Sequence, residues 1–269
     1  MTTEQGVSTE STVLAERQDG VLLITLNRPN RLNALTDEMR GQLRDILRDA
    51  RAAASVRAVV LTGAGRAFCS GAELSARPVE PDGTPASRPP ARLPRYGWLQ
   101  DFSTLPVPVV AAVNGVAAGA GLGLALACDI RVVAPDAYFY SAFAHRALAA
   151  DNGVSWTMTR LVGPAKTLRW LWNADRISAD LALQSGLADV VPTEASALDE
   201  ALRIAQGWAN GPTVALGTIK QQVYHALEST FADQLVFEEL TTARVSQTAD
   251  VKEGAAAFRE KREPQFKGQ

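Results

Sequence analysis

Residues 108–129 have the sequence PVVAAVNGVAAGAGLGLALACD, an apolar stretch rich in alanine and glycine that is the most informative about the fold. An apolar run leads to Asn114 and Gly115, and glycines then follow at positions 119, 121 and 123. Asn-Gly pairs favour tight turns, and glycines at this spacing let a helix pack closely on its neighbours. The stretch predicts a buried strand, a turn and the start of a helix.

The same region raises the question of a membrane span, because no charged residue lies between Phe102 and Cys128. That length is sufficient to cross a bilayer. Pro106 and Pro108 break the run, however, and the Asn-Gly pair interrupts it again. We expect no transmembrane helix here.

Further strands and helices alternate along the chain, which is typical of α/β architecture. A β-hairpin is predicted at the start, with Asp19-Gly20 in its turn. Thr36 is a candidate N-cap for a helix whose apolar residues recur at helical spacing. Other strands are expected at 57–61, 108–113 and 129–134.

The chain divides by composition into three parts. We predict a disordered leader at 1–11, an α/β core at 12–194 and a helical region at 195–269, with helices at 195–210, 212–227, 231–248 and 254–261. The apolar faces of these C-terminal helices are expected to pack either on this chain's own core or on another subunit. Six of the 14 prolines fall within 75–97, which predicts a long surface loop, either a lid or a mobile insertion.

Composition excludes several classes of function. The 269 residues are 46% hydrophobic and 21% charged with a net charge of -2, so no basic field attracts nucleic acid or a membrane surface. Cys69 and Cys128 are too few for a disulfide framework or a zinc cluster, and we predict no metal site. Free thiols and the absence of a recognisable secretory signal predict a cytoplasmic protein.

Two glycine-containing turns are the candidate sites of chemistry, at 67–74 (AFCSGAEL) and 114–123 (NGVAAGAGLG). Neither completes a dinucleotide-binding fingerprint, since Phe68 and Leu124 stand at the third glycine position. Each turn follows a predicted strand and can point a backbone N–H outward. Two such N–H groups on one oxygen would form an oxyanion hole. Glycine-mediated helix packing is the alternative explanation.

Together with their flanking residues, these turns resemble the crotonase family, also called the enoyl-CoA hydratase/isomerase superfamily. The resemblance covers nearly the whole chain and is carried by residues 26–29 (LNRP), 32–35 (LNAL), 67–74, 108–129, 160–163 (RLVG), 179–191 and 252–267. It implies a spiral core of repeated β-β-α units with a C-terminal all-helical oligomerisation region. It also implies an acyl-CoA thioester substrate, no further cofactor, and a homotrimer or dimer of trimers.

The resemblance assigns roles to individual residues. Ala72 and Ala120 match the two oxyanion-hole positions, whose backbone N–H groups would bind the thioester oxygen. The CoA would contact the chain at positions matching Arg31, Leu32, Ala34, Ala67 and Cys69. Phe258 and Lys267 match positions that approach the CoA of a neighbouring subunit. Arg31 and Lys267 would hold phosphates locally despite the net charge of -2.

Family hydratases use two glutamates, and the matching residues here are Gly123 and Phe143. Neither can carry a proton, so hydration by the usual route is not expected. Asp151 matches the position of the single acidic residue of several family isomerases. A carboxylate beside an oxyanion hole suits proton transfer, although an Asp before Asn152-Gly153 also suits helix capping.

An acyl pocket would be lined by Trp98, Phe143, His145 and Trp156, although core packing explains the aromatic residues equally well. His145 is also a candidate second proton carrier. The leading hypothesis is double-bond isomerisation with Asp151 as the proton shuttle. The alternatives are hydration or a retro-Claisen type of reaction assisted by Glu80 or Asp82, and non-catalytic acyl-CoA binding.

Overall fold

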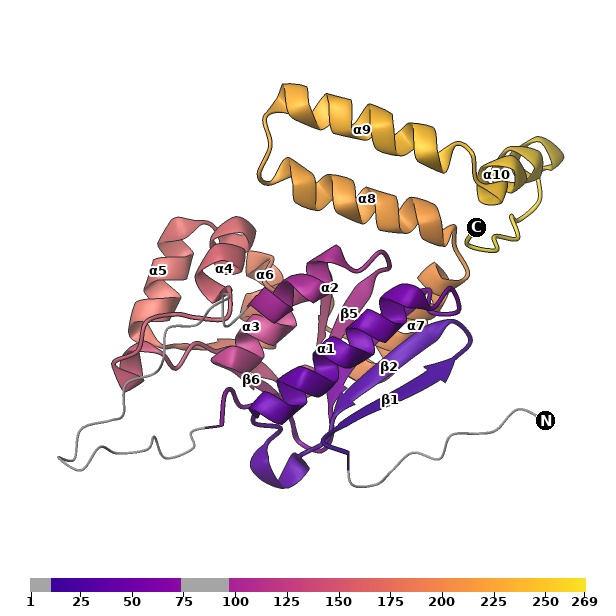
Figure 1. The fold of residues 1–269 in the computed structure, drawn as a ribbon. Helices are drawn as coiled ribbons and strands as arrows, with labels where there is room; N and C mark the ends of the chain where they lie inside the picture. The colour runs from indigo at the N-terminus through magenta and orange to yellow at the C-terminus, as the bar shows by residue number, and fades with distance from the viewer. Residues whose placement is uncertain (1–10, 74–96) are drawn as a thin grey trace.

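The computed structural model describes residues 11–73 and 97–269. In this part of the chain two β-sheets form the centre, with helices on their outer faces (Figure 1). The predicted leader and the predicted proline-rich loop lie outside the described residues, except for Ser11 and Gly97.

The larger sheet has the strand order β1-β2-β3-β5-β7. Its strands are β1 (Val13–Gln18), β2 (Val21–Leu26), β3 (Ala58–Gly63), β5 (Val109–Val113) and β7 (Ile130–Val133). β1 and β2 are antiparallel and the other neighbours are parallel. Asp19 and Gly20 have φ of 49° and 85°, so the predicted hairpin turn is confirmed with both residues in the left-handed region.

The smaller sheet has the order β4-β6-β8-β9. Its strands are β4 (Ala67–Cys69), β6 (Val116–Ala118), β8 (Tyr138–Tyr140) and β9 (Arg176–Ser178). β4, β6 and β8 follow β3, β5 and β7 along the chain, and a helix comes after each pair: α2 (Gln100–Thr104), α3 (Ala120–Ala127) and α4 (Val154–Val162). This repeated β-β-α unit, with its two strands in different sheets, confirms the predicted fold class.

Residues 108–129 form β5, β6 and α3, so the predicted strand, turn and helix are confirmed. All residues of β5 are buried, which explains the lack of charge there. Within residues 11–73 and 97–269 we find no helix whose length and apolar character would let it cross a membrane.

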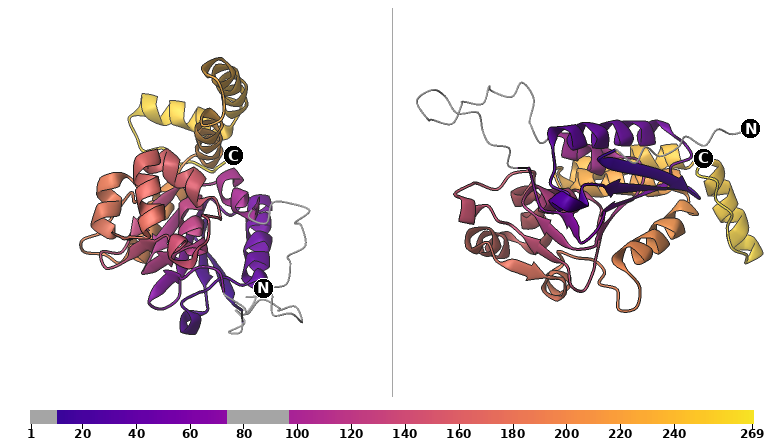
Figure 2. Two further views of the ribbon diagram at one scale, coloured as in Figure 1. Left: turned by 90° about the vertical axis from the view of Figure 1, so that its left-hand side faces the viewer. Right: turned by 90° about the horizontal axis from the view of Figure 1, so that it is seen from below.

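Helices α1 (Asp37–Ala52) and α7 (Ala197–Ala209) cover opposite faces of the larger sheet (Figure 2). Alternate residues of β3 belong to two separate apolar clusters, one with α1 and one with α7, as expected for a strand buried on both faces. The predicted cap of α1 is confirmed, because Thr36 Oγ1 accepts from the Met39 N–H at 3.1 Å. The first helix of the 195–269 region thus covers the chain's own sheet.

Helices α8 (Thr213–Ala226) and α9 (Phe231–Val245) lie side by side beyond the core, and α10 (Ala249–Glu260) follows at their end (Figure 1). The remaining helices are α5 (Pro164–Asn173), α6 (Ala179–Ser185) and the 3-10 turns Pro29–Arg31, Gly97–Leu99 and Ala144–Arg146. The predicted start of the last helix at 254 is wrong. It begins at Ala249, where the Thr248 hydroxyl accepts from the Val251 N–H.

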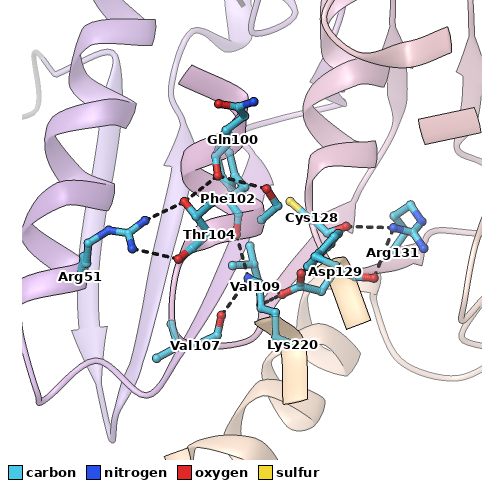
Figure 3. Close-up of polar contacts among 12 residues, drawn as sticks. Arg51, Gln100, Phe102, Thr104, Val107, Val109, Cys128, Asp129, Arg131 and Lys220 are labelled. Atoms are coloured by element: carbon cyan, nitrogen blue, oxygen red, sulfur yellow. Dashed lines mark hydrogen bonds and ion pairs between the residues drawn. The ribbon is translucent and has the colours of Figure 1, made fainter. Parts of the chain in front are cut away.

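A buried ion pair ties α8 to the core (Figure 3). Lys220 Nζ lies 2.8 Å from Asp129 Oδ2 and donates to the carbonyl oxygens of Phe102 and Val107 at 2.7 and 3.0 Å. The Val109 N–H donates to the same Asp129 oxygen at 2.8 Å. Burial raises the pKa of the Asp129 carboxyl and lowers that of Lys220, and the charge of each partner opposes the shift of the other.

Candidate active site

The two predicted turns are in contact. They follow β4 and β6, which are neighbouring parallel strands. Gly71 in the first turn has φ of 111°, and a methyl group built on it would lie 3.0 Å from Ala118 O and 3.7 Å from Ala120 N. The backbone of the first turn therefore packs on the second at the start of α3.

Neither proposed donor N–H group forms a hydrogen bond within its own helix or strand pairing. Leu35 donates to Gly71 O at 2.8 Å and accepts from the Glu73 N–H at 2.9 Å, so in this parallel bridge the intervening Ala72 turns its own N–H to the opposite side. Ala120 is the first residue of α3, where an N–H has no acceptor within the helix. Between the described residues, we find no backbone acceptor for either group.

The loop that carries Asp151 packs on the same helix. A methyl group on Gly123 would lie 2.5 Å from Asn152 O and 2.7 Å from Asn152 Cβ. Gly123 comes three residues after Ala120, which is about one helical turn. The Asp151 loop therefore reaches α3 one turn from the expected oxyanion donor.

Asp151 does not cap a helix. The N-cap residue of α4 is Gly153, with φ of 72° and no side-chain capping bond. Asp151 contributes only its main-chain oxygen there, to the Val154 N–H at 3.1 Å. Its half-buried carboxylate instead accepts from Asn152 Nδ2 at 2.6 Å. The capping alternative is therefore wrong.

The positions that match the hydratase glutamates are unsuited to carboxylates. Asn152 already fills the space beside Gly123, and Phe143 is buried in the main apolar cluster. Glu73 Oε1 lies 2.9 Å from Arg28 Nη2, and this bond holds the pKa of the Glu73 carboxyl below its usual range.

The structure brings together the expected CoA-binding segments. Ser70 donates its N–H to Leu32 O at 2.9 Å, which joins the segment containing Arg31 and Ala34 to the end of β4. Arg31 is exposed, whereas Ala67 and Cys69 are buried, so neither of these two offers an exposed side chain to a ligand. Burial raises the pKa of the Cys69 thiol to about 12, which keeps it protonated near neutral pH.

Two asparagines position these loops, and neither role was predicted from the sequence. Asn33 is fully buried, accepts from the Arg28 N–H at 2.9 Å and donates to Ala67 O at 2.7 Å. Asn114 accepts from the Gly63 N–H at 3.2 Å. An amide side chain within the otherwise apolar 32–35 motif was the available signal for the first of them.

The four residues expected to line an acyl pocket lie in different environments. Trp98 and Phe143 belong to the main core cluster, and Trp156 is exposed with the Arg160 guanidinium 3.7 Å from its ring centroid. His145 is exposed, and its Nδ1 lies 3.1 Å from the Tyr140 hydroxyl. Tyr140 O accepts from the Gly119 N–H at 3.0 Å, which connects His145 to the second turn.

Phe258 and Lys267 lie at the C-terminal end, on and after α10. Phe258 is 87% exposed, and the Lys267 N–H donates to Asp250 Oδ1 at 2.7 Å. Figure 1 places α10 beyond the α8–α9 pair, away from β6 and α3. One chain therefore does not bring these two residues to the turns.

Comparisons with known proteins show the family of the chain. Residues 16–269 match the family described as Enoyl-CoA hydratase/isomerase. The chain belongs to this family. It is 38% identical over 258 residues to 1,2-epoxyphenylacetyl-CoA isomerase of Escherichia coli K12, which covers 95% of this chain and 98% of the relative.

Solved structures show the same enoyl-CoA hydratase/isomerase fold. An enoyl-CoA hydratase from Polaromonas sp. JS666 is 33% identical with a TM-score of 0.84, covering 94% of this chain and 99% of that one. An enoyl-CoA hydratase from Bacillus anthracis is 29% identical with a TM-score of 0.86, covering 96% and 100%. Similar proteins therefore carry both isomerase and hydratase names.

Metal ligation finds no support in the part of the chain that is described. Across residues 11–73 and 97–269, no three His, Cys, Asp or Glu side chains are grouped to hold an ion. Glu80 and Asp82, considered as additional carboxylates, lie outside the described residues.

Proposed function

We propose that this enzyme isomerises the double bond of an acyl-CoA thioester, with Asp151 as the proton carrier. The observation that carries the proposal is the contact of the Asp151 loop with α3 beside Gly123. This contact supports a carboxylate next to the turn that contains Ala120, where the backbone N–H would stabilise a negatively charged thioester oxygen.

The thioester oxygen would accept from the N–H groups of Ala72 and Ala120. The Asp151 carboxylate removes a proton from the α carbon of a 3-enoyl-CoA and becomes a carboxylic acid. The electron pair moves onto the thioester oxygen, giving a dienolate. Return of the same proton to the γ carbon forms the 2-enoyl-CoA and restores the carboxylate. Each N–H donor contributes about 3 kcal/mol to stabilising the dienolate-like transition state.

Hydration is disfavoured because it needs a second acid or base to activate and deliver water. Gly123 carries no side chain and Phe143 is apolar, so no carboxylate is available at either of those positions. Hydratase activity would therefore require a carboxylate from elsewhere in the chain.

A second candidate is isomerisation of an epoxide on an aryl acyl-CoA. It is favoured by the 38% identity to 1,2-epoxyphenylacetyl-CoA isomerase over 95% of this chain. A substrate panel containing 3-enoyl-CoA, 2-enoyl-CoA and 1,2-epoxyphenylacetyl-CoA separates the candidates by which compound is consumed.

The assignment of Asp151 is tested by Asp151→Asn. Turnover of 3-enoyl-CoA should fall by at least 10³-fold while acyl-CoA affinity stays within about threefold, because the amide keeps the shape but cannot accept the proton. Asp136→Asn, at an exposed position on the loop after β7, serves as the control and should keep full activity. Full activity in Asp151→Asn would exclude this role.

A further inference from the structure

Asn152, the neighbour of Asp151, has a buried side-chain amide in which only one of the two polar groups forms a hydrogen bond. The residue is 3% exposed, and its Nδ2 donates to Asp151 Oδ1 at 2.6 Å. Its Oδ1 is also buried and has no hydrogen-bond partner in the described part of the chain. An unpaired buried carbonyl destabilises a fold, so stability alone does not account for an asparagine at this position.

The backbone of Asn152 is also unfavourable for most residues. Its φ is 51°, and Gly153 follows with φ of 72°. Two successive left-handed residues turn the chain sharply before α4, and glycine adopts this conformation more easily than asparagine. The turn therefore does not require an asparagine either, and the one feature that glycine lacks is the amide that contacts Asp151.

This amide is attached to a closely packed backbone. Asn152 O and Cβ rest on Gly123, and a methyl group on Gly121 would lie 2.2 Å from Cys69 O. The start of α3 thus packs closely both on the end of β4 and on the Asn152 turn. A carboxylate held by the Asn152 amide is therefore attached to a turn that packs on the helix beginning at Ala120.

We propose that Asn152 is a positioning residue, whose side-chain N–H holds the Asp151 carboxylate in the orientation in which it takes and returns the substrate's proton. The inference rests on the proposed function of Asp151. It adds that the rate of proton transfer depends on Asn152, a residue next to Asp151 that need not touch the substrate. Small displacements of a reacting group lower rates by up to about 10²-fold without weakening binding.

The test is Asn152→Gly, which removes the amide and the unpaired carbonyl and suits the left-handed backbone. We expect kcat to fall by about 10- to 100-fold, KM to stay within about threefold, and the melting temperature to change by less than about 3 °C. A merely structural residue would instead lower the melting temperature and alter kcat and KM together, and that result would overturn the proposal.

Asn152→Asp sharpens the test, because aspartate has nearly the same size and also tolerates the left-handed backbone but offers an acceptor in place of the donor. We expect a kcat no higher than that of Asn152→Gly, and wild-type kcat would overturn the proposal. The matched control is Asn173→Gly, at an exposed residue whose Nδ2 lies 3.4 Å from Asp175 Oδ2, and it should keep the wild-type kcat.

Measuring Asp151→Asn in the same assay keeps the two claims apart. If Asp151→Asn is active, the proposed function itself is wrong. If Asp151→Asn is inactive and Asn152→Gly keeps the wild-type kcat, only the role of Asn152 is overturned. Loss of turnover in Asp151→Asn together with a kcat-only defect in Asn152→Gly supports both.

Discussion

Gly123 shows how one residue without a side chain shapes the site. It stands where family hydratases have a glutamate, and the space that a side chain would need is filled by Asn152. The glycine therefore excludes one carboxylate and admits the loop that carries another. The sequence revealed the missing glutamate, but it could not reveal the contact with Asn152, because that contact depends on how distant segments pack.

Gly123→Ala should move the Asp151 loop, since the new methyl group would lie 2.5 Å from Asn152 O. We expect a stability loss of about 1–3 kcal/mol by urea denaturation and a kcat reduced at least tenfold. Gly41→Ala is the control, because a methyl group there meets nothing within 4 Å and alanine favours the helix by about 1 kcal/mol. Wild-type kcat in Gly123→Ala would contradict the importance of this contact.

The burial of the two cysteines predicts that their thiols react slowly in the native protein. Burial raises the pKa of both the Cys69 and the Cys128 thiol to about 12, so at pH 8 only about 10⁻⁴ of each is thiolate. A thiol reagent should label almost none of the native protein and two thiols per chain after unfolding in guanidinium. Rapid labelling of the folded protein at pH 8 would show that these residues are accessible.

At the scale of elements, most of the architecture was predictable, because caps and periodicity are local signals. The Asp19-Gly20 hairpin and the Thr36 cap are confirmed, and the strands at 57–61, 108–113 and 129–134 are found within two residues of their predicted ends. The start of α10 was missed because 249–253 has little apolar periodicity, although the Thr248 cap was a local signal for it.

Lys220→Met tests how α8 is held. The substitution leaves the Asp129 carboxylate buried without its cation, which costs about 3–5 kcal/mol of folding free energy. Burial raises the pKa of Asp129, so without Lys220 the folded state binds a proton more tightly than the unfolded state, and stability falls as the pH rises. Urea denaturation should show a larger deficit at pH 8 than at pH 5.

The control for Lys220→Met is Arg203→Met, which breaks an exposed ion pair with Glu200 on α7. That change should alter stability by less than about 0.5 kcal/mol at either pH. An equal effect of the two substitutions would mean that the buried pair does not anchor α8.

At the scale of the whole molecule, the C-terminal helices divide into two kinds. α7 is covered by the sheet, but the apolar side chains of α9 are exposed, with Phe231 at 78%, Val236 at 58% and Leu240 at 65%. Such surfaces favour association with further subunits. The apolar residues of α7 are concentrated on one face more strongly than those of α9, which is consistent with α7 lying on the sheet of its own chain.

We therefore expect the purified protein to contain three or six chains by light scattering. A Val236→Asp/Leu240→Asp variant should dissociate, because burying two unpaired carboxylates is strongly unfavourable. By the family resemblance, it should also lose acyl-CoA affinity, since Phe258 and Lys267 would no longer reach a neighbouring site. A monomeric wild-type protein at micromolar concentration would contradict this arrangement.

The most direct test of the central claim is proton exchange at the α carbon of a bound 3-enoyl-CoA, followed by NMR in deuterated water. The wild-type enzyme should exchange the α protons, and Asp151→Asn should bind the same thioester without exchanging them. A wild-type protein that binds the thioester but exchanges no α proton would contradict the account and indicate a non-catalytic acyl-CoA binder.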